Sequence, residues 1–342
     1  MLTLHRGRVV AAGDAGVGMQ RLEVEVSGER YAAMADVGRV GPAEVDDEVV
    51  VNTAARELAL GSGGFDIVHV NLTRGLGGRG VPGAHVMKLN YTSLQHAVLP
   101  VEGEALTLPL ESPVAVTFLH GQLAPVAWAF AQTAPGRALG YVQTAGGALP
   151  GSLSDTVAQL RERGLLAGHL TAAPAFGGDG EAITVAGALH HGGAERGWDA
   201  LVCGPGPGIL GSASALGHGG LAALDSAHAA LALGAPTLLV PRTSGADPRE
   251  RHRGISHHVA TVLSLLLDRV MVAVPEHGDR RELVDDRHEW RRVPVDVDGY
   301  AASGLPARTM GRELDEDPLF FAAALAGGAA LAGMMRDREQ RV

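Results

Sequence analysis

Residues 200–240 read ALVCGPGPGILGSASALGHGGLAALDSAHAALALGAPTLLV, and our fold prediction starts from this stretch. An apolar run of strand length, Ala200–Cys203, is followed by a glycine-rich loop, a helical stretch at Gly220–Leu233 and a second apolar run at Pro236–Val240. Strands that are apolar throughout are typical of parallel sheets, because both faces of such sheets are covered. A strand, a helix and another such strand form a βαβ unit, so this stretch predicts a parallel sheet.

The same alternation continues on both sides of this stretch. Further apolar runs of strand length are Val114–His120, Ala138–Thr144, Ala167–Ala172 and Arg269–Val274, and further helical stretches are Ser154–Arg163, Glu181–His191 and Ser256–Leu267. We therefore expect residues 111–342 to form an α/β domain with a doubly wound, mainly parallel sheet of the Rossmann or flavodoxin type.

This domain ends in an uncharged stretch, Leu319–Met335, that consists mostly of Ala and Gly. It follows Asp317-Pro318, a cap residue and a proline at the first helical position. A membrane span needs about 20 strongly apolar residues, so we interpret the stretch as a buried or interface helix and expect no membrane partner. Its Gly327-Gly328 pair would let another helix pack closely, and we expect a homo-oligomer, with a dimer favoured. The charged residues 276–316 before it are expected to be a solvated surface excursion.

Residues 1–110 are β-rich and predict a small barrel or sandwich domain. Short alternating runs are separated by Gly, Asp and Pro turns, and they lie at Gly7–Ala12, Gln20–Val26, Glu29–Val37, Glu48–Asn52 and Phe65–Asn71. A small barrel could bind oligonucleotides. The acidic run from Glu44 to Glu48 and an aromatic content of only 4% argue against that use.

The composition restricts the partners and the compartment. A net charge of −10 repels a phosphate backbone, so a small soluble ligand is favoured over nucleic acid. Cys203 is the single cysteine, so no intrachain disulfide can form, which suits a reducing compartment. Because the first residues also lack the apolar stretch of a signal peptide, we expect a cytoplasmic protein. Lys88 is the only lysine among 28 Lys and Arg residues, which makes it a candidate for a position that needs lysine.

Ligands of open parallel sheets bind beyond the carboxyl ends of the strands. Nearly every predicted strand is followed there by glycine together with a polar group. The segments in question are His120-Gly121-Gln122, Thr144–Gly147, Phe176–Glu181, Cys203–Gly208, Arg242–Asp247 and Pro275–His277. We expect these segments to line a shared crevice.

The loop after Cys203 contains a G-x-G-x-x-G match at Gly206, Gly208 and Gly211. In dinucleotide-binding folds such glycines let backbone N–H groups reach a pyrophosphate, and an acid follows near the end of the next strand. Here the nearest acid is Asp225, inside a predicted helix, so the fingerprint is incomplete. A nucleotide cofactor, a simpler phosphate or carboxylate cradle and a purely structural turn all stay open, and Cys203 itself is interpreted as a core thiol.

Residues 247–258, DPRERHRGISHH, contain three arginines and three histidines directly before an apolar helix. Ser256 is a plausible N-cap, and a helix N-terminus attracts anions and keeps nearby histidines neutral. Arginines can hold a carboxylate or phosphate with two parallel hydrogen bonds. The same stretch contains residue types that bind a divalent metal, namely Asp247, His252, His257 and His258, although adjacent histidines on a helix point about 100° apart. Anion binding, metal binding and a solvated charged loop stay open.

Several runs resemble an uncharacterised bacterial family, the domain-of-unknown-function family numbered 3866. They are Met87–Thr92, Phe176–Asp179, Gly204–Gly206, Asp247–His258, Thr309–Arg312 and Asp315–Pro318, so the resemblance spans nearly the whole chain. It implies a bacterial cytosolic protein, and it implies no particular activity.

Our main hypothesis is an enzyme that acts on a small anionic metabolite, phosphorylated or carboxylated, at the carboxyl edge of the sheet. We expect His257 or His258 to act as general base, with Asp247 or Asp179 orienting it or holding a metal. The expected substrate-binding residues are Lys88, Tyr91, Arg242, Ser244, Arg249, Arg253, Ser256, Gly206, Gly208 and Gly211.

A ligand sensor or assembly subunit without chemistry is the alternative, and an oxidoreductase with a nucleotide cofactor is a third hypothesis. The cofactor is unknown, and a divalent metal is one that the residue types would allow.

Overall fold

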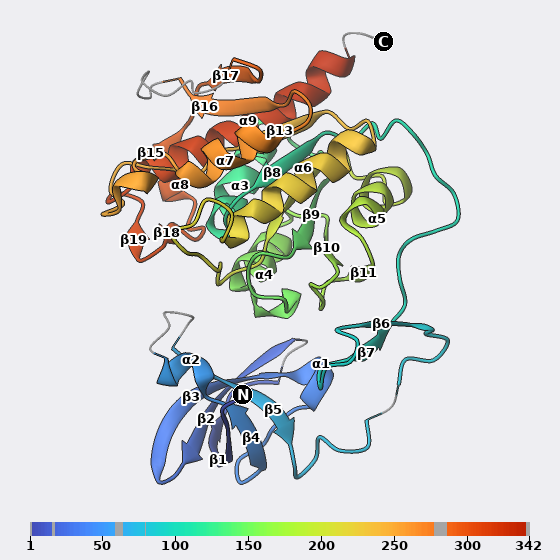
Figure 1. Cartoon of the computed structure of the whole chain (residues 1–342), viewed down its shortest axis with the longest axis vertical. Coiled ribbons are helices and arrows are strands. Elements are labelled where there is room, and N and C mark those ends of the chain that lie inside the picture. The colour runs from blue at the N-terminus through green and yellow to red at the C-terminus, as the bar shows by residue number, and fades with distance from the viewer. Residues whose placement is uncertain (1, 16–17, 59–63, 79, 277–285, 340–342) are drawn as a thin grey trace. The chain divides into compact units, whose positions relative to one another are not determined.

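The computed structural model describes residues 2–15, 18–58, 64–78, 80–276 and 286–339. The chain divides into two compact units, Met1–Ala84 and His85–Val342. This division comes earlier in the chain than the boundary near residue 110 that the sequence predicts. Lys88 and Tyr91 therefore belong to the second unit, and each unit is described by itself below (Figure 1).

The first unit is a closed five-stranded barrel with the strand order β1-β2-β3-β5-β4. Its strands are β1 (Leu4–Ala12), β2 (Met19–Val26), β3 (Glu29–Asp36), β4 (Glu48–Asn52) and β5 (Asp66–Asn71), with the short helices α1 (Val37–Val40) and α2 (Ala54–Glu57) between them. The pair β3–β5 is parallel, and the other barrel pairs are antiparallel. Alternate side chains such as Val9, Val24 and Val49 fill the interior. The predicted barrel and all five predicted strands are confirmed.

The second unit contains an eight-stranded, all-parallel sheet with the order β11-β10-β9-β12-β8-β13-β16-β17. The strands are β8 (Val114–Thr117), β9 (Leu139–Thr144), β10 (Gly168–Ala172), β11 (Gly180–Ala182), β12 (Ala200–Pro205), β13 (Thr237–Val240), β16 (Met271–Pro275) and β17 (Glu289–Val293). An antiparallel hairpin of β6 (Val86–Lys88) and β7 (His96–Val98) precedes them. The predicted parallel sheet is confirmed.

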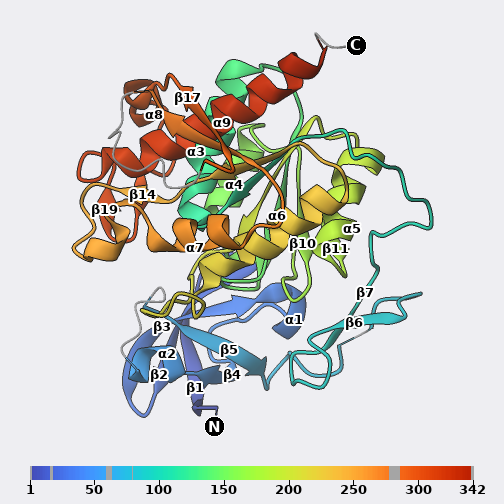
Figure 2. The same cartoon turned by 45° about the horizontal axis from the view of Figure 1, so that its top comes forward.

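Helices cover both faces of this sheet (Figures 1 and 2). The helices α3 (Leu123–Thr133), α8 (Val297–Ala302) and α9 (Pro318–Glu339) pack together on one face. The helices α5 (Val185–His190), α6 (Ala222–Ala232) and α7 (His257–Leu265) form the other layer, and α4 (Asp155–Glu162) packs against α3. The chain proceeds from β8 through β9 and β10 to β11 toward one edge, and then from β12 through β13 and β16 to β17 toward the other. The direction reverses next to β8, and such a reversal is where ligands of doubly wound sheets bind.

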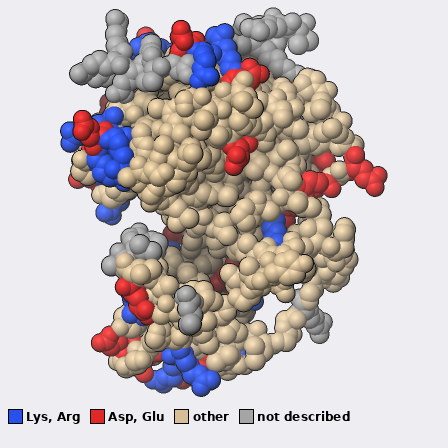
Figure 3. All heavy atoms as spheres, viewed as in Figure 1, with Lys and Arg blue, Asp and Glu red and all other residues tan. Residues whose placement is uncertain are grey.

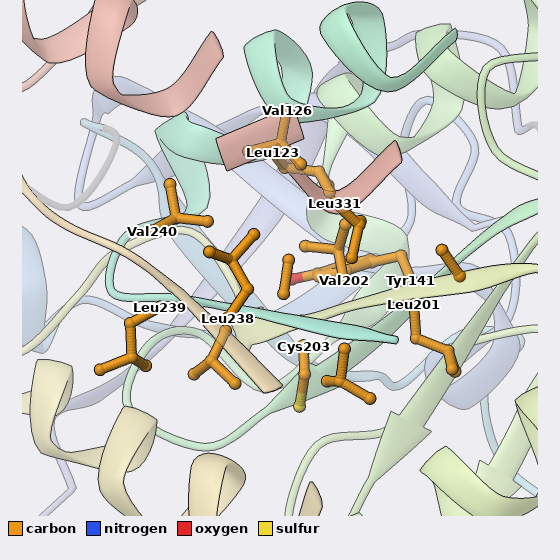
Figure 4. Close-up of a cluster of buried hydrophobic side chains, with 14 of the residues drawn as sticks. Leu123, Val126, Tyr141, Leu201, Val202, Cys203, Leu238, Leu239, Val240 and Leu331 are labelled. Carbon is orange, nitrogen blue, oxygen red and sulfur yellow. The ribbon is translucent and has the colours of Figure 1, made fainter. Parts of the chain in front are cut away.

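The core lies between the sheet and its two helix layers. Figure 4 shows Val126 and Leu331, from α3 and α9, on one side of the strands, while Cys203 and Leu239 point to the other side. Burial raises the pKa of the Cys203 thiol to about 12, so it stays protonated and apolar in character.

The long helix α9 is a core element of the second unit. By length and composition alone, Pro318–Arg336 could cross a membrane, but 67% of its most apolar window is buried within the chain. Gly327 and Gly328 face Val240 of β13 and the backbone of Val126 in α3 so closely that a Cβ atom would collide there. The close partner of the glycine pair is therefore a helix and a strand of the same chain, and the homo-oligomer stays a prediction.

Part of the segment 276–316 is more ordered than the sequence predicts. It contains the edge strand β17, the helix α8 and a small hairpin of β18 (Arg308–Thr309) and β19 (Arg312–Glu313), while residues 277–285 lie outside the described residues. Tyr300 of α8 is fully buried and packs edge-on against Trp128. The prediction of a solvated excursion is wrong for this part, because β17 is a charged edge strand whose pattern resembles that of a loop.

Candidate functional site

Four histidine rings meet at the carboxyl edge of the sheet, close to the point where the strand order reverses. His218 follows β12, His252 ends a short 3-10 turn (Glu250–His252), and His257 and His258 begin α7. The rings of His218 and His258 stack with centroids 3.5 Å apart, and the ring of His252 lies 4.9 Å from those of His257 and His258. We call these residues the four-histidine cluster.

Local hydrogen bonds explain how the chain assembles this cluster. After β13 the chain forms β14 (Thr243–Ser244), which pairs with β15 (Gly254–Ile255) and so closes the intervening loop. Ser256 then caps α7, and its Oγ accepts a hydrogen bond from the His258 amide at 3.3 Å. The same Oγ lies 2.8 Å from His252 Nδ1. The predicted N-cap is thus confirmed, and it also positions a histidine from the preceding turn.

Burial makes the four histidines neutral at physiological pH. It is the main cause that lowers the pKa of His252 to about 4 and that of His258 to about 2, and it lowers the pKa of His218 and His257 as well. Neighbouring rings and the charge of Arg242 add to the effect. Neutral imidazole is the form of histidine that acts as a base or as a metal ligand.

Three ring nitrogens of the cluster are buried without a hydrogen-bond partner. They are His218 Nδ1, His257 Nε2 and His258 Nε2. The opposite nitrogens of two of these rings are engaged: His218 Nε2 lies 2.9 Å from the Ala215 carbonyl oxygen, and His258 Nδ1 lies 3.5 Å from a terminal nitrogen of Arg242. Buried polar atoms are rarely left unpaired in proteins, so these nitrogens indicate a position for a ligand.

Asp247 does not contact the histidine rings of the cluster within the described residues; its carboxylate contacts arginines. Arg249 donates to it through Nε and a terminal nitrogen, both at 2.9 Å. Terminal nitrogens of Arg242 and Arg312 lie 3.2 and 3.5 Å away. Burial alone would raise the pKa of Asp247, but these hydrogen bonds and charges hold it well below its ordinary value. The structure therefore brings Asp247 together with Arg242 and Arg249 in an ion-pair network, and its oxygens are occupied there.

A second buried carboxylate anchors the same loop. Asp317, the residue before α9, accepts hydrogen bonds from the Ser244 hydroxyl, from the Gly245 amide at 2.8 Å and from Arg312 Nε at 3.1 Å. Ser244 is buried in this contact, so it holds the loop against α9. Arg312 joins both carboxylates, and the sequence analysis did not identify it.

Arg251 and Arg253 are the arginines of this loop whose charge is not neutralised. Both are exposed, they flank the buried His252, and neither forms an ion pair within the described part of the chain. Arg253 donates through Nε to the Asp247 carbonyl oxygen at 3.0 Å, which fixes the base of its side chain. Figure 3 shows arginines gathered at the edge of this unit where Figure 1 places β15 and β19. The loop is a local positive region in a protein of net charge −10.

The other predicted site residues lie outside the contacts of the four-histidine cluster. Lys88 is buried, and its Nζ contacts Glu181 Oε2 at 2.6 Å and the carbonyl oxygens of Thr171 and Ala175 at 3.0 and 2.6 Å. These three acceptors match the three donors of an ammonium group, which explains why this position retains lysine. Tyr91 is fully exposed on the loop between β6 and β7.

Asp179 lies beside another pair of residues. It contacts Arg161, and it accepts a hydrogen bond from the His169 amide at 2.9 Å. Its carboxylate therefore stabilises the loop after β10 through these two contacts.

The glycine-rich loop packs against the neighbouring loop after β9. A Cβ atom at Gly206 would collide with the Ala148 carbonyl oxygen, and Gly208 has a φ of +69°, which favours glycine. Gly211 has open space around it, and α6 begins only at Ala222. Gly206 thus serves close loop packing and Gly208 a positive φ, and the three glycines do not stand at a helix N-terminus as a dinucleotide fingerprint requires.

A second histidine group lies at the carboxyl ends of β8 to β10, and sequence reasoning noted only His120 of it. His120 Nε2 lies 2.6 Å from the hydroxyl of Ser154, which caps α4. Tyr141 donates its hydroxyl to the Pro205 carbonyl oxygen at 3.0 Å and stacks on His169. Tyr141 and His169 lie inside the strands β9 and β10, so no loop motif marks them. We call His120, Tyr141, Ser154 and His169 the His120 group.

A hollow of about 690 Å³ opens at the opposite, amino-terminal edge of the sheet. Its lining includes Trp198 and Met335, and the lining residues Arg137 and Asp199 pair with each other at 3.1 Å. The unpartnered ring nitrogens described above lie at the carboxyl edge, so we place the candidate site there.

Residues 33–328 match the family described as "Protein of unknown function (DUF3866)". The chain belongs to this family. No curated protein matches it. A solved structure, that of YjeQ from Thermotoga maritima, is similar at 14% identity over 65% of each chain, so this chain spans about two thirds of the length of that protein. With a TM-score of 0.14, this similarity carries no argument about fold or function.

Proposed function

We propose that this protein is an enzyme that acts on a small anionic molecule, phosphorylated or carboxylated, at the four-histidine cluster. The observation that carries the proposal is the combination of uncommitted, neutral ring nitrogens with exposed arginines whose charge is not neutralised. This combination lies at the carboxyl edge of a doubly wound sheet, where the strand order reverses.

His218 is the residue to which we assign the role of general base. Its Nε2 lies 2.9 Å from the Ala215 carbonyl oxygen, and a carbonyl only accepts hydrogen bonds, so Nε2 carries the proton. The lone pair is then on Nδ1, which is buried without a partner. A base of this kind accepts a proton from a substrate that reaches it. The sequence predicted His257 or His258 as the general base. We prefer His218, because its tautomer follows from its contact with the Ala215 carbonyl oxygen.

Arg251 and Arg253 are proposed to bind the negative group of the substrate. Two exposed guanidinium groups on either side of His252 attract an anion, and each can donate two parallel hydrogen bonds to a carboxylate or phosphate. Arg242 and Arg249 are already paired with Asp247, so they stabilise the loop and take a smaller part in binding.

Anion binding can be tested by thermal unfolding with and without inorganic phosphate, on protein treated with a chelator. We expect phosphate to raise the Tm of the wild type and to leave that of the Arg251→Gln/Arg253→Gln variant unchanged. The control is Arg137→Gln/Arg292→Gln, which also removes two positive charges from this unit and should retain the response. An equal response in both double variants would overturn the anion site.

Turnover separates the enzyme from a ligand sensor. A mixture of phosphorylated and carboxylated metabolites is incubated with the protein, and loss of substrate is followed by mass spectrometry. We expect the wild type to consume at least one compound, and the His218→Gln variant to lose this activity while it keeps phosphate stabilisation. Stabilisation by phosphate without conversion of any compound would favour the sensor.

A further inference from the structure

Three of the four histidines form a group that has the geometry of a metal site. His252, His257 and His258 each offer one ring nitrogen, and these nitrogens all lie within 4.8 Å of one another. We propose that these three residues bind a divalent transition metal ion, Zn²⁺ in the simplest case. This goes beyond the proposed function, since the binding of an anion and the base His218 need no metal.

The chemistry of the three residues fits such an ion. The neutral imidazole ring of histidine is the commonest metal ligand among protein side chains, and zinc binds it through a ring nitrogen. His252 and His258 are almost completely buried, and Nε2 of both His257 and His258 has no partner. Leaving a polar nitrogen buried and unpaired is unfavourable, and apolar side chains would fill the same space without that cost. A bound cation removes this cost by using the lone pairs.

The distances indicate a site that closes on its ion. Ligand nitrogens in a tetrahedral zinc site lie about 3.3 Å apart, as follows from Zn–N bonds of about 2.0–2.1 Å. The rings therefore have to approach one another by at most about 1.5 Å from their separation of up to 4.8 Å. His257 is only half-buried and begins a helix, so its side chain has room to move.

The surroundings already hold one of the three rings in place. The second nitrogen of His252 lies 2.8 Å from Ser256 Oγ, and such a second contact orients a ligating imidazole. Three protein ligands leave a fourth position open, which is the arrangement of catalytic zinc sites. Arg242 and Arg249 oppose a bare cation, so an anionic ligand in the fourth position is expected to strengthen metal binding.

Asp247 is not part of this proposal, although the sequence suggested it as a ligand. Its carboxylate oxygens contact Arg242, Arg249 and Arg312. Removing Asp247 from the ligand set leaves a site made only of nitrogen, which favours zinc, cobalt or nickel over magnesium or calcium.

The test is a titration of the full chain, purified without affinity nickel and treated with a chelator, with Co²⁺ and then Zn²⁺ in a buffer free of phosphate. We expect one equivalent of Co²⁺ to give visible absorption bands of tetrahedral intensity and Zn²⁺ to displace it. His257→Gln should lower the affinity for both ions at least tenfold. The matched control is His191→Gln, which changes the half-buried member of the other adjacent histidine pair, His190-His191, and should leave the affinity unchanged.

Absence of Co²⁺ and Zn²⁺ binding by the wild type would overturn the proposal, whatever the variants show. Equal loss of affinity in both variants would also overturn it, because binding would then not belong to this site. Circular dichroism establishes that His257→Gln is folded. The phosphate experiment above uses metal-free protein and this titration uses phosphate-free protein, so each proposal can fail without the other.

Discussion

Two groups of histidines lie at the carboxyl edge of the same sheet, and they differ in what their ring nitrogens contact. In the His120 group, His120 Nε2 contacts Ser154, and burial lowers the pKa of both His120 and His169 to about 4. The four-histidine cluster has pKa values lowered by the same cause, and its Ser256 contacts His252 as Ser154 contacts His120. Low pKa and a capping serine are thus common to both groups.

The difference lies in the unused nitrogens. His169 Nε2 is the unpartnered ring nitrogen of the His120 group within the described residues, whereas the four-histidine cluster has three, next to exposed arginines. The neutral state of a buried histidine therefore reports burial alone. What separates a packing group from a candidate ligand site is whether several lone pairs without partners converge.

The largest effect is expected from Tyr141→Ala, which removes the centre of the His120 group. The side chain is fully buried, so its loss should lower the free energy of unfolding by about 3–5 kcal/mol. Urea unfolding measures this loss. Zn²⁺ affinity of the protein that stays folded should not change. A large change in that affinity would show that the two groups are one site and would break the comparison.

The next effect concerns pH. His120 and His252 have a pKa of about 4 in the folded protein, against about 6.5 in an unfolded chain. Each binds a proton more readily when unfolded, so the stability that it contributes is fully present above about pH 6.5 and is lost as the pH falls toward 4. The loss is up to about 3 kcal/mol for His120, and it is smaller for His252, where solvent screens the neighbouring charges. Urea unfolding at pH 7 and pH 4.5 should show a smaller loss in His120→Gln and in His252→Gln than in the wild type.

A smaller effect comes from the two capping serines. Ser154→Ala and Ser256→Ala should each cost about 1 kcal/mol of stability, because each removes an N-cap and a contact with a histidine. The two variants should differ in metal binding, since only Ser256 orients a proposed ligand. Equal Zn²⁺ affinity of both variants would contradict the role of Ser256 in orienting a metal ligand.

The smallest effect is expected from Arg251→Gln. The charge of Arg251 contributes to the lowered pKa of His257, after burial and His218. Its removal should raise the pKa of His257 only slightly, because one screened charge at the surface acts weakly. An NMR titration of the His257 ring measures the shift. No change for His257 together with a shift for His120 would contradict the placement of Arg251.

Much of the fold could be predicted from the sequence. The barrel strands alternate polar and apolar residues, and β8, β9, β10, β12, β13 and β16 are apolar runs because both of their faces are buried. The strand β17 was missed because an edge strand can carry Trp290 among charged residues without burying them. The boundary between the units was also not visible, because β6 and β7 resemble the strands of the barrel.

The candidate site was predictable only in part. The density of histidine and arginine in residues 247–258 identified His252, His257, His258 and the cap Ser256, and the position after strands placed them at one edge. Residue type alone could not distinguish paired charges from unpaired ones. Arg242 and Arg249 both pair with Asp247, and Lys88 is satisfied by three oxygens from Thr171, Ala175 and Glu181.

The sequence by itself determined the order of strands and helices and the capping of α7, because these depend on neighbours along the chain. Only the tertiary structure decided which nitrogens keep a free lone pair. His218 lies in the loop after β12, His252 in a 3-10 turn and His258 in the first turn of α7, and their rings meet because these segments pack together. The contacts of His218 with Ala215 and of His252 with Ser256 are local, but the stacking of His218 on His258 joins segments distant in the chain. Such a long-range contact has no signature in composition or spacing, so the convergence of the rings appears only in three dimensions.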